Sequence, residues 1–242
     1  MKTLSGNAFA ERMERLSKLV KCRLLTTPEE LKKLAQLRYR GYVASGMVSP
    51  GDDASPEDGL HDGWDEIGLS YSVGMFVFGR MVGSMRVHVN RLPGETQEHM
   101  TPSCKTFGDV LEPYIDKGVR FIDPTRFVIE PGLQDQDVAL AYYNLRIACV
   151  AAAHFDVHYI ISSPGKRHAA WYRHVSRHRA ISEPRSYPGL TEEIVCMMAS
   201  RDDFRDLERR FPYLRSTPEE QVEMFGPKTW IKSSGSAMAD VA

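Results

Sequence analysis

The amino-acid sequence predicts an α/β fold in which helices cover a mixed β-sheet, and three observations support it. Residues 69–78 and 80–90 have the pattern of two strands that meet at a turn around Gly79, as in an antiparallel hairpin. Strand patterns at residues 121–130, 157–163 and 192–199 alternate with helical patterns. No repeat or linker divides residues 1–233, so we expect a single domain and a frayed tail at residues 234–242.

The first part of the chain predicts two helices and a long loop. Phe9, Met13 and Leu16 stand at helical spacing in residues 1–20, and a strand pattern follows at residues 21–25. Thr27 then precedes Pro28, and Glu30 completes a capping box, so a helix should begin here and run to about residue 44. The turn-forming, acidic residues 49–59 predict a long mobile loop, a feature that is often functional.

The second part alternates between strands and helices. Residues 91–118 are ambiguous, with a helix expected near residues 106–115. The strand at residues 121–130 stops at Pro131-Gly132, and Asp135 opens a helix that keeps its apolar period to Ala152. After the strand at residues 157–163 we expect a basic helix over residues 166–179, the strand at 192–199, and a short polar helix at 202–210. A sheet of this kind could be splayed in the middle to admit a ligand.

The composition excludes several classes of function. The 242 residues carry a formal net charge of -1, which gives no global field for nucleic acid or an anionic membrane. No apolar stretch is long enough to span a bilayer, and the charged N-terminus has no secretory pattern, so we expect a cytoplasmic protein without stable membrane insertion. The four scattered cysteines indicate reduced thiols. No metal spacing, nucleophile elbow or P-loop occurs.

Charged residues that interrupt apolar patterns are the most informative. Arg38 falls on the apolar face of the second expected helix, Arg86 lies in a strand of small and apolar residues, and Arg126 lies in the strand at residues 121–130. A buried guanidinium requires carboxylate partners. The candidate partners are Asp62, Asp65 and Asp123. Such a network is either a structural ion-pair cluster or part of a functional site.

The same residues carry a family resemblance, which covers roughly residues 24–199. The segments are Leu37-Arg38-Tyr39-Arg40-Gly41-Tyr42-Val43, Asp62-x-x-Asp65, Gly83-Ser84-Met85-Arg86 and Asp123-Pro124-Thr125-Arg126-Phe127. In order and spacing they resemble acyl-homoserine-lactone synthases, and still more the long-chain N-acyl amino acid synthases, both of the GNAT superfamily. Two features depart from the lactone synthases: residues 45–59 lack their tryptophan, and Asp123 stands where they have glutamate.

The resemblance implies a GNAT-like splayed sheet and transfer of a fatty acyl group from a thioester to the amine of an amino acid or related small acceptor. The thioester would enter between the strands at residues 126–130 and 157–163. A backbone N–H near Phe127 or Val128 would hold the oxyanion. Asp123 is the first candidate for the base and Glu130 the second. Five side chains would order the acceptor pocket and its loop: Arg38, Asp62, Asp65, Arg86 and Arg126. No metal or redox cofactor is needed.

The expected acyl donor is an acyl carrier protein thioester. The turn at residues 131–137 has one glycine and two acidic residues, which suits a coenzyme A diphosphate poorly. The basic helix would steer an acidic carrier protein toward the site. Its candidate contacts are Lys166, Arg167, Arg173 and Arg177. The alternative interpretation is an ordinary solvated helix face.

Two other functions remain open at this point. One is a coenzyme A-dependent acetyltransferase, and the other is a GNAT-like module that binds acyl ligands or a partner without catalysis. Met75, Met81 and Met85 would suit an acyl channel, but ordinary core packing explains them equally well. The sequence leaves open the acceptor amine, the acyl length and the oligomeric state.

Overall fold

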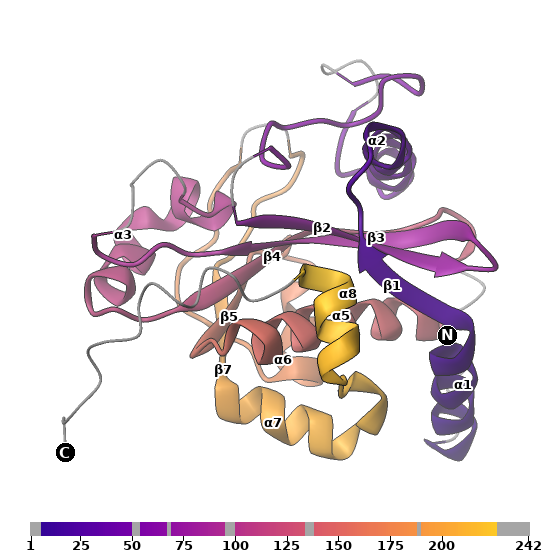
Figure 1. The fold of residues 1–242 in the computed structure, drawn as a ribbon. Helices are drawn as coiled ribbons and strands as arrows, with labels where there is room; N and C mark the ends of the chain where they lie inside the picture. Colours follow the sequence, from indigo (N-terminus) through magenta and orange to yellow (C-terminus); the bar gives the residue numbers. More distant parts are fainter. Residues whose placement is uncertain are drawn as a thin grey trace.

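The computed structural model describes residues 6–49, 54–66, 69–94, 100–133, 138–187 and 190–226. Within these residues, seven strands form one sheet in the order β1-β2-β3-β4-β5-β7-β6 (Figure 1). The strands are β1 (Val20–Leu24), β2 (Ser70–Val77), β3 (Arg80–Val89), β4 (Phe121–Ile129), β5 (Tyr159–Ser162), β6 (Arg179–Ala180) and β7 (Met197–Ser200). The helices are α1 (Gly6–Leu19), α2 (Pro28–Ala44), α3 (Pro102–Asp116), α5 (Val138–Phe155), α6 (Ala169–Ser176), α7 (Arg201–Arg210) and α8 (Pro218–Phe225).

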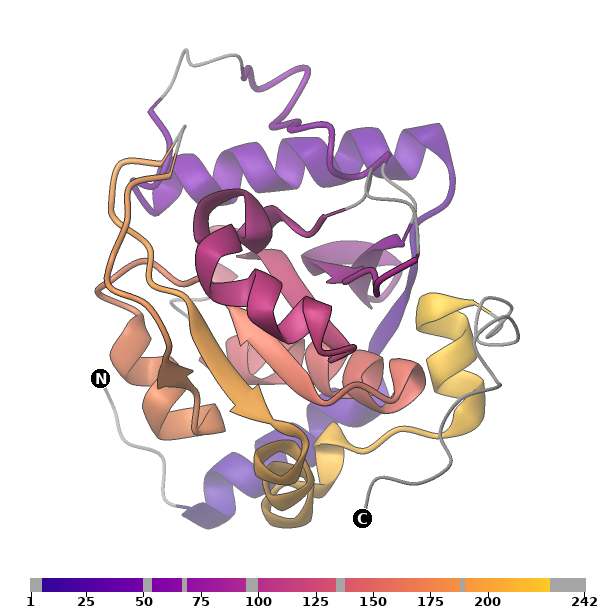
Figure 2. The ribbon, with the colours of Figure 1, turned by 90° about the vertical axis from the view of Figure 1, so that its left-hand side faces the viewer.

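Helices cover both faces of the sheet, as the sequence predicts. α2 lies on one face, and α5 and α8 lie on the other (Figure 1). The apolar side chains of α5 form the centre of the main core, where Ile147, Val150 and Ala151 are fully buried beneath β3 and β4. Figure 2 shows α3 and β5 toward the viewer with α2 running across behind them. The architecture is a mixed sheet flanked by helices, as the sequence predicts.

Local sequence signals explain several element boundaries. The capping box at the start of α2 is present, because the Thr27 side chain accepts from the Glu30 N–H and the Glu30 side chain accepts from the Thr27 N–H. The turn between β2 and β3 contains Gly79 with a φ of +77°, a conformation that glycine adopts without strain. These predicted elements, including the hairpin, are therefore confirmed.

The sheet opens between β4 and β5. The two strands run parallel and pair only at Phe121 with Tyr159 and Ile122 with Ile160. β4 continues to Ile129, beyond the end of this pairing. The backbone edges of the two strands therefore separate after Ile122, which confirms the splayed sheet and leaves room for a ligand in the middle of the fold.

β4 also carries a bulge on its other edge. Ser84 pairs with Val128 and Arg86 pairs with Thr125, so β4 has one more residue than β3 between these two pairs. Arg126 absorbs the extra residue with a φ of +52°. A bulge of this kind bends the strand and re-aims the adjacent side chains. It lies beside the opening between β4 and β5.

Some predicted boundaries were wrong. The basic helix expected over residues 166–179 is confined to α6, because Arg177 takes a left-handed conformation that ends it and Arg179 then pairs with β7. The strand expected at residues 192–199 is a strand only from Met197, since Ile194 instead makes isolated bridges to Gly165 and Arg185. α3 begins at Pro102, earlier than expected. α8 was not predicted.

Several sequence expectations reach beyond the described residues. They include the centre of the loop at residues 50–53, the end of the turn at residues 131–137 with the helix opening at Asp135, and the tail at residues 234–242. The described end of the loop packs on α2, where Leu60 N–H donates to the Ala35 carbonyl. Within the described chain, no helix combines the length and apolar character needed to cross a bilayer.

Candidate active site

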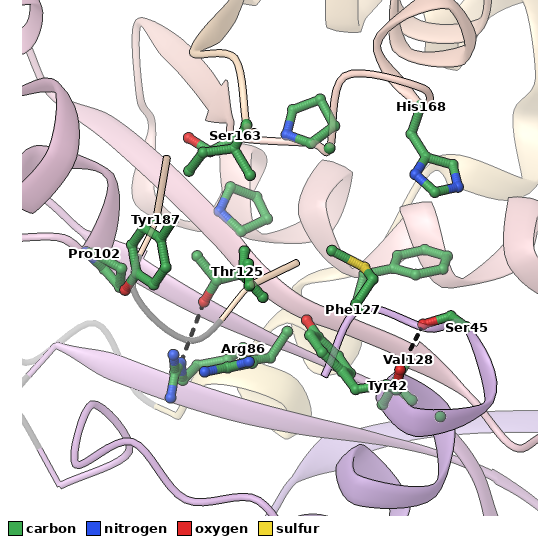
Figure 3. Close-up of a pocket in the computed structure, with 18 of the residues that line it drawn as sticks. Tyr42, Ser45, Arg86, Pro102, Thr125, Phe127, Val128, Ser163, His168 and Tyr187 are labelled. Carbon is green, nitrogen blue, oxygen red and sulfur yellow. Dashed lines mark hydrogen bonds between the residues drawn. The ribbon is translucent and has the colours of Figure 1, made fainter. Parts of the chain in front are cut away.

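A cavity of about 430 Å³ lies where β4 and β5 separate (Figure 3). Figure 3 shows Ser163 and His168 across the cavity from Tyr42 and Arg86. One part of the wall is apolar, with contributions from β4, α5, α6 and residues 190–194: Phe127, Val128, Ile129, Ala141, Trp171, Tyr172, Leu190 and Ile194. Another part is charged and includes Asp62, Arg86 and Arg126. The cavity can therefore hold a ligand that combines an apolar chain with a charged group.

The charged part belongs to a connected network. Arg38 donates to both oxygens of Asp65, at 2.5 and 2.9 Å. Arg86 donates to both oxygens of Asp62, at 2.6 and 2.9 Å, and to Asp65 at 3.2 Å. Arg126 reaches Asp62 at 2.7 Å. The structure thus brings together all five residues that the sequence predicts for the acceptor pocket, from α2, β3, β4 and the segment before β2.

The network fixes the charge of its members. Burial alone would raise the pKa of Asp62, but Arg86 and Arg126 outweigh it and hold that pKa well below its ordinary value. Burial likewise opposes ionisation of Asp65, and hydrogen bonds from Arg38 and Ser72 lower its pKa. Both aspartates are therefore carboxylates at neutral pH. Three guanidinium groups face these two carboxylates, so the five side chains carry one excess positive charge.

Arg126 occupies a special position in this network. Its guanidinium carbon lies 5.1 Å from the centre of the Tyr42 ring, in a cation–π arrangement. Burial works against the charged form, but Tyr42 and Asp62 together raise the pKa of Arg126. Arg126 has the left-handed backbone of the bulge and lines the cavity, and a bulge of this kind re-aims the side chain that it carries.

Asp123 lies apart from this network and is fully buried. Its two carboxylate oxygens accept hydrogen bonds from the backbone N–H and the hydroxyl of Ser103, each at 2.8 Å. Burial raises the pKa of Asp123, and the bonds from Ser103 only partly oppose this effect. Asp123 does not line the cavity, but Ser103 does. The Ser103 hydroxyl oxygen lies 2.7 Å from the hydroxyl oxygen of Ser163, which directly follows β5 and also lines the cavity.

Val128 and its neighbours form a tightly packed part of the wall. A Cβ on Gly41 of α2 would collide with the Val128 side chain, so the glycine allows α2 to approach β4 closely. On the other face of the sheet, the buried side chain of Asn144 donates to the carbonyls of Ser84 at 3.1 Å and Val128 at 3.4 Å. The backbone at the bulge is held from both faces.

Comparison with known proteins identifies the family. A family model described as N-acyl amino acid synthase FeeM matches residues 33–200. The chain belongs to this FeeM family. It is accordingly an N-acyltransferase of the GNAT kind, which confirms the family and the enzyme class predicted from the sequence. A search of curated protein sequences finds no significant match.

Solved structures show the same fold as this FeeM-family chain. FeeM itself, from uncultured soil microbes, has a TM-score of 0.62 and 14% identity, covering 78% of this chain and 94% of FeeM. TofI, solved with an inhibitor and MTA, has a TM-score of 0.54 and 16% identity, covering 84% and 99%. MesI, a CoA-dependent acyl-homoserine lactone synthase, has a TM-score of 0.53 and 14% identity, covering 81% and 97%.

Other predicted site residues of the FeeM-family chain lie away from the cavity. The Glu130 carboxylate binds Arg40 at 3.1 and 2.7 Å and does not line the cavity, so the structure does not place the second candidate base near a substrate. Met75 and Met85 belong to the main core, which agrees with the packing interpretation. They do not line the cavity.

The predicted carrier-protein residues form ion pairs within the chain. Lys166 lies 3.8 Å from Glu193, Arg167 3.1 Å from Glu192, and Arg177 2.8 Å from Asp206. Arg173 is exposed on α6. The basic character of this segment is therefore weaker than its sequence indicates. Arg167 and His168 also line the cavity.

Sequence reasoning missed several residues of the site. Ser103 and Ser163 carry the hydrogen bonds that link Asp123 to the cavity, and Tyr42 supports Arg126. Thr101-Pro102 repeats the Thr-Pro pair that begins α2, so the start of α3 at Pro102 could have been recognised. No sequence pattern marks Ser163 as different from the adjacent Ser162, whose hydroxyl bonds to His178 instead.

Proposed function

We propose that this N-acyltransferase moves a fatty acyl group from an acyl carrier protein thioester to the amine of an amino acid or a related small acceptor. The observation that carries the proposal is the cavity at the opening between β4 and β5, which is apolar in one part and charged in another. The apolar part suits the acyl chain. The volume of the whole cavity is in the range of small-molecule sites.

The charged part suits an amino acid. The five side chains of the arginine–aspartate network have one excess positive charge, which favours an acceptor that carries a carboxylate. Arg126 and Arg86 line the cavity and could bind this carboxylate, while Asp62 keeps their guanidinium groups in position. In this arrangement the acceptor amine would point toward the thioester carbon.

The bulge on β4 would stabilise the developing oxyanion. The extra residue at Arg126 interrupts the regular pairing of β4 with β3 next to Phe127 and Val128. A backbone N–H left unpaired by the bulge would be fixed in place before the reaction, which is the condition for effective oxyanion stabilisation. Asp123 would act as the base. Its raised pKa and full burial suit a group that takes a proton and later returns it. No metal or redox group enters this scheme.

The donor assignment rests on the turn after β4 and on α6. In the sequence, residues 131–137 contain one glycine and two acidic residues, a poor setting for a diphosphate. Arg173 is exposed on α6 and Arg167 lines the cavity, so these two basic groups would be the first to attract an acidic carrier protein. Coenzyme A is the alternative donor, because the ion pairs of Lys166, Arg167 and Arg177 reduce the charge available to an acidic partner.

Two experiments test this function. Mass analysis of lipids from expressing cells should reveal N-acyl amino acids. New acetylated amines without such lipids would support a coenzyme A-dependent acetyltransferase. The absence of both kinds of product would support a binding module. With purified enzyme, the same acyl chain should transfer at least tenfold faster from carrier protein than from coenzyme A. Arg173→Glu should raise the KM for the carrier-protein donor at low salt only, whereas Arg80→Glu on the distant hairpin should not. Equal use of both donors would defeat the carrier-protein assignment.

A further inference from the structure

A chain of three hydrogen-bonded side chains connects a buried carboxylate with the cavity wall. Asp123 accepts from the Ser103 hydroxyl at 2.8 Å, and the Ser103 and Ser163 hydroxyl oxygens are 2.7 Å apart. Ser163 directly follows β5, where β4 and β5 have separated, and it lines the cavity (Figure 3). Asp123 itself does not reach the cavity, so any proton exchange with a bound molecule needs an intermediary.

The donors and acceptors of this chain have one consistent arrangement when Asp123 is ionised. A carboxylate only accepts, so the Ser103 hydroxyl donates its single proton to Asp123. The Ser103 oxygen must then accept from Ser163, which uses the single proton of Ser163. The Ser163 oxygen keeps two lone pairs. These two lone pairs can accept from a donor in the cavity.

The surroundings hold this arrangement in place. Ser103 lies in the first turn of α3, and its backbone N–H bonds the second oxygen of Asp123 at 2.8 Å. Burial raises the pKa of Asp123, while Ser103, Thr101 and the charge of Arg86 on β3 oppose this effect and favour the carboxylate. Cys104 and Cys196 face the same region, and burial raises the pKa of both thiols, so they remain neutral. Tyr187 is the other titratable group whose charge interacts with Asp123. Asp123 is therefore the proton acceptor of this cluster.

We propose that Ser163 and Ser103 relay the proton of the acceptor amine to Asp123. This inference rests on the proposed acyl transfer. As the amine nitrogen bonds the thioester carbon, its N–H donates to the Ser163 oxygen. The Ser163 proton passes to Ser103, and the Ser103 proton passes to Asp123. The C–S bond then breaks, and the electron pair leaves with sulfur as a thiolate. The reverse relay returns one proton to the thiolate, so the products are an amide, a thiol and the original carboxylate.

In this scheme Ser163 is a catalytic residue because it touches the reacting amine, whereas Ser103 and Asp123 act through it. A relay of this kind also explains why a fully buried carboxylate can serve a cavity that it does not line. Both hydroxyls bond at distances that allow direct proton transfer, 2.8 and 2.7 Å. Removing either hydroxyl should interrupt the same path as removing the carboxylate.

Steady-state kinetics of four variants tests the relay. Ser163→Ala, Ser103→Ala and Asp123→Asn should each lower kcat about 100-fold while the KM of both substrates changes less than threefold, in the range of lost acid–base catalysis. Ser103→Thr keeps a hydroxyl and should retain activity within a few-fold. The matched control is Ser162→Ala, which removes a buried hydroxyl from the adjacent position of β5, where it bonds His178 and not Asp123. It should leave kcat unchanged.

A double variant separates a relay from independent effects. Ser163→Ala combined with Asp123→Asn should be no slower than Asp123→Asn alone, because both changes break one path. Multiplied losses, or losses confined to KM, would overturn the relay while acyl transfer itself stands. A purified enzyme that forms no N-acyl product from any carrier-protein or coenzyme A thioester would overturn both the proposed function and the relay's catalytic role.

Infrared spectroscopy tests the connection without turnover. The carboxyl band of Asp123, identified by its loss in Asp123→Asn, should shift in Ser163→Ala, although Ser163 does not touch Asp123. It should not shift in Ser162→Ala. An Asp123 band unaffected by Ser163→Ala would contradict the hydrogen-bonded chain, whatever the activity of the enzyme.

Discussion

Arg126 and Asp62 form an ion pair of 2.7 Å, although 64 positions separate them in the sequence. The contact depends on a backbone feature, since Arg126 occupies the bulge of β4 with a positive φ that turns its side chain toward the segment before β2. Asp62 in turn holds Arg86. One aspartate thus orders two cationic groups in the wall of the cavity.

Replacing Asp62 should affect both stability and acceptor binding. Asp62→Asn keeps the shape of the side chain but leaves two largely buried arginines short of a carboxylate. We expect the free energy of unfolding to fall by about 2–4 kcal/mol, measured by urea denaturation. The KM of the acceptor should rise about tenfold. Glu14→Gln, which breaks an exposed pair with Lys18, should change neither quantity. If the Asp62→Asn enzyme were stable and its KM for the acceptor unchanged, the network would have no role in acceptor binding.

The left-handed backbone at residue 126 can be tested separately from its charge. Both Arg126→Gly and Arg126→Ala remove the guanidinium, but only glycine adopts a φ of +52° without a steric penalty. The glycine variant should therefore be about 1 kcal/mol more stable than the alanine variant in denaturant unfolding. The opposite order, found in most strands, would show that the bulge is not maintained in solution.

The close approach of α2 to β4 should make residue 41 intolerant of a methyl group. Gly41→Ala places a Cβ against the Val128 side chain, so we expect a loss of about 1–3 kcal/mol in unfolding free energy despite the better helix propensity of alanine. The rate of acyl transfer should also fall, because Val128 lines the cavity.

Gly108 in α3 provides the matched control for this substitution. A Cβ there would lie 3.3 Å from the end of the flexible Glu112 side chain, which can move. Gly108→Ala should therefore gain about 0.5–1 kcal/mol through helix propensity. If Gly41→Ala gained stability as well, the contact between α2 and Val128 would be looser than the structure shows.

Two buried histidines should make the protein less stable as the pH falls below neutrality. Burial lowers the pKa of His88 to about 3 and that of His178 to about 4. The unfolded chain binds protons on these groups below about pH 6.5, whereas the folded protein does not until these lower values. The contribution of the two histidines to the free energy of unfolding is therefore complete above about pH 6.5. It decreases as the pH falls below this value, by up to about 1.4 kcal/mol per pH unit for each histidine. The raised pKa of Asp123 acts in the opposite direction.

His178→Gln isolates one of these contributions. Glutamine can keep a hydrogen bond to Ser162 or Ser176 but does not titrate. The slope of unfolding free energy against pH between 6.5 and 4.5 should decrease by about 1.4 kcal/mol per unit relative to the unmodified protein. Urea denaturation at three pH values measures it. An unchanged slope would mean that His178 is already protonated in the folded state.

Much of the fold and part of the site could be predicted from local sequence. The capping box at Thr27 determines where α2 begins, because its partners are three residues apart. Thr217-Pro218-Glu219-Glu220 carries the same signal, and α8 begins there with the same pair of bonds. The arginine–aspartate network was also predictable in outline, since a guanidinium such as Arg38 on an apolar helix face requires a carboxylate wherever the chain can supply one.

The tertiary structure alone decided the remaining features. Whether Glu130 or Asp123 lies near the cavity depends on the pairing of β4 and on contacts with α2 and α3, which no local pattern encodes. The charge of residues 166–177 could be counted from the sequence, but its neutralisation by Glu192, Glu193 and Asp206 could not. Local sequence signals act between residues that are close in the chain. They determine where helices and strands begin, and they indicate which charged side chains will be buried. The sites of chemistry depend on which distant side chains the packed sheet brings within hydrogen-bond distance, as with Asp123, Ser103 and Ser163.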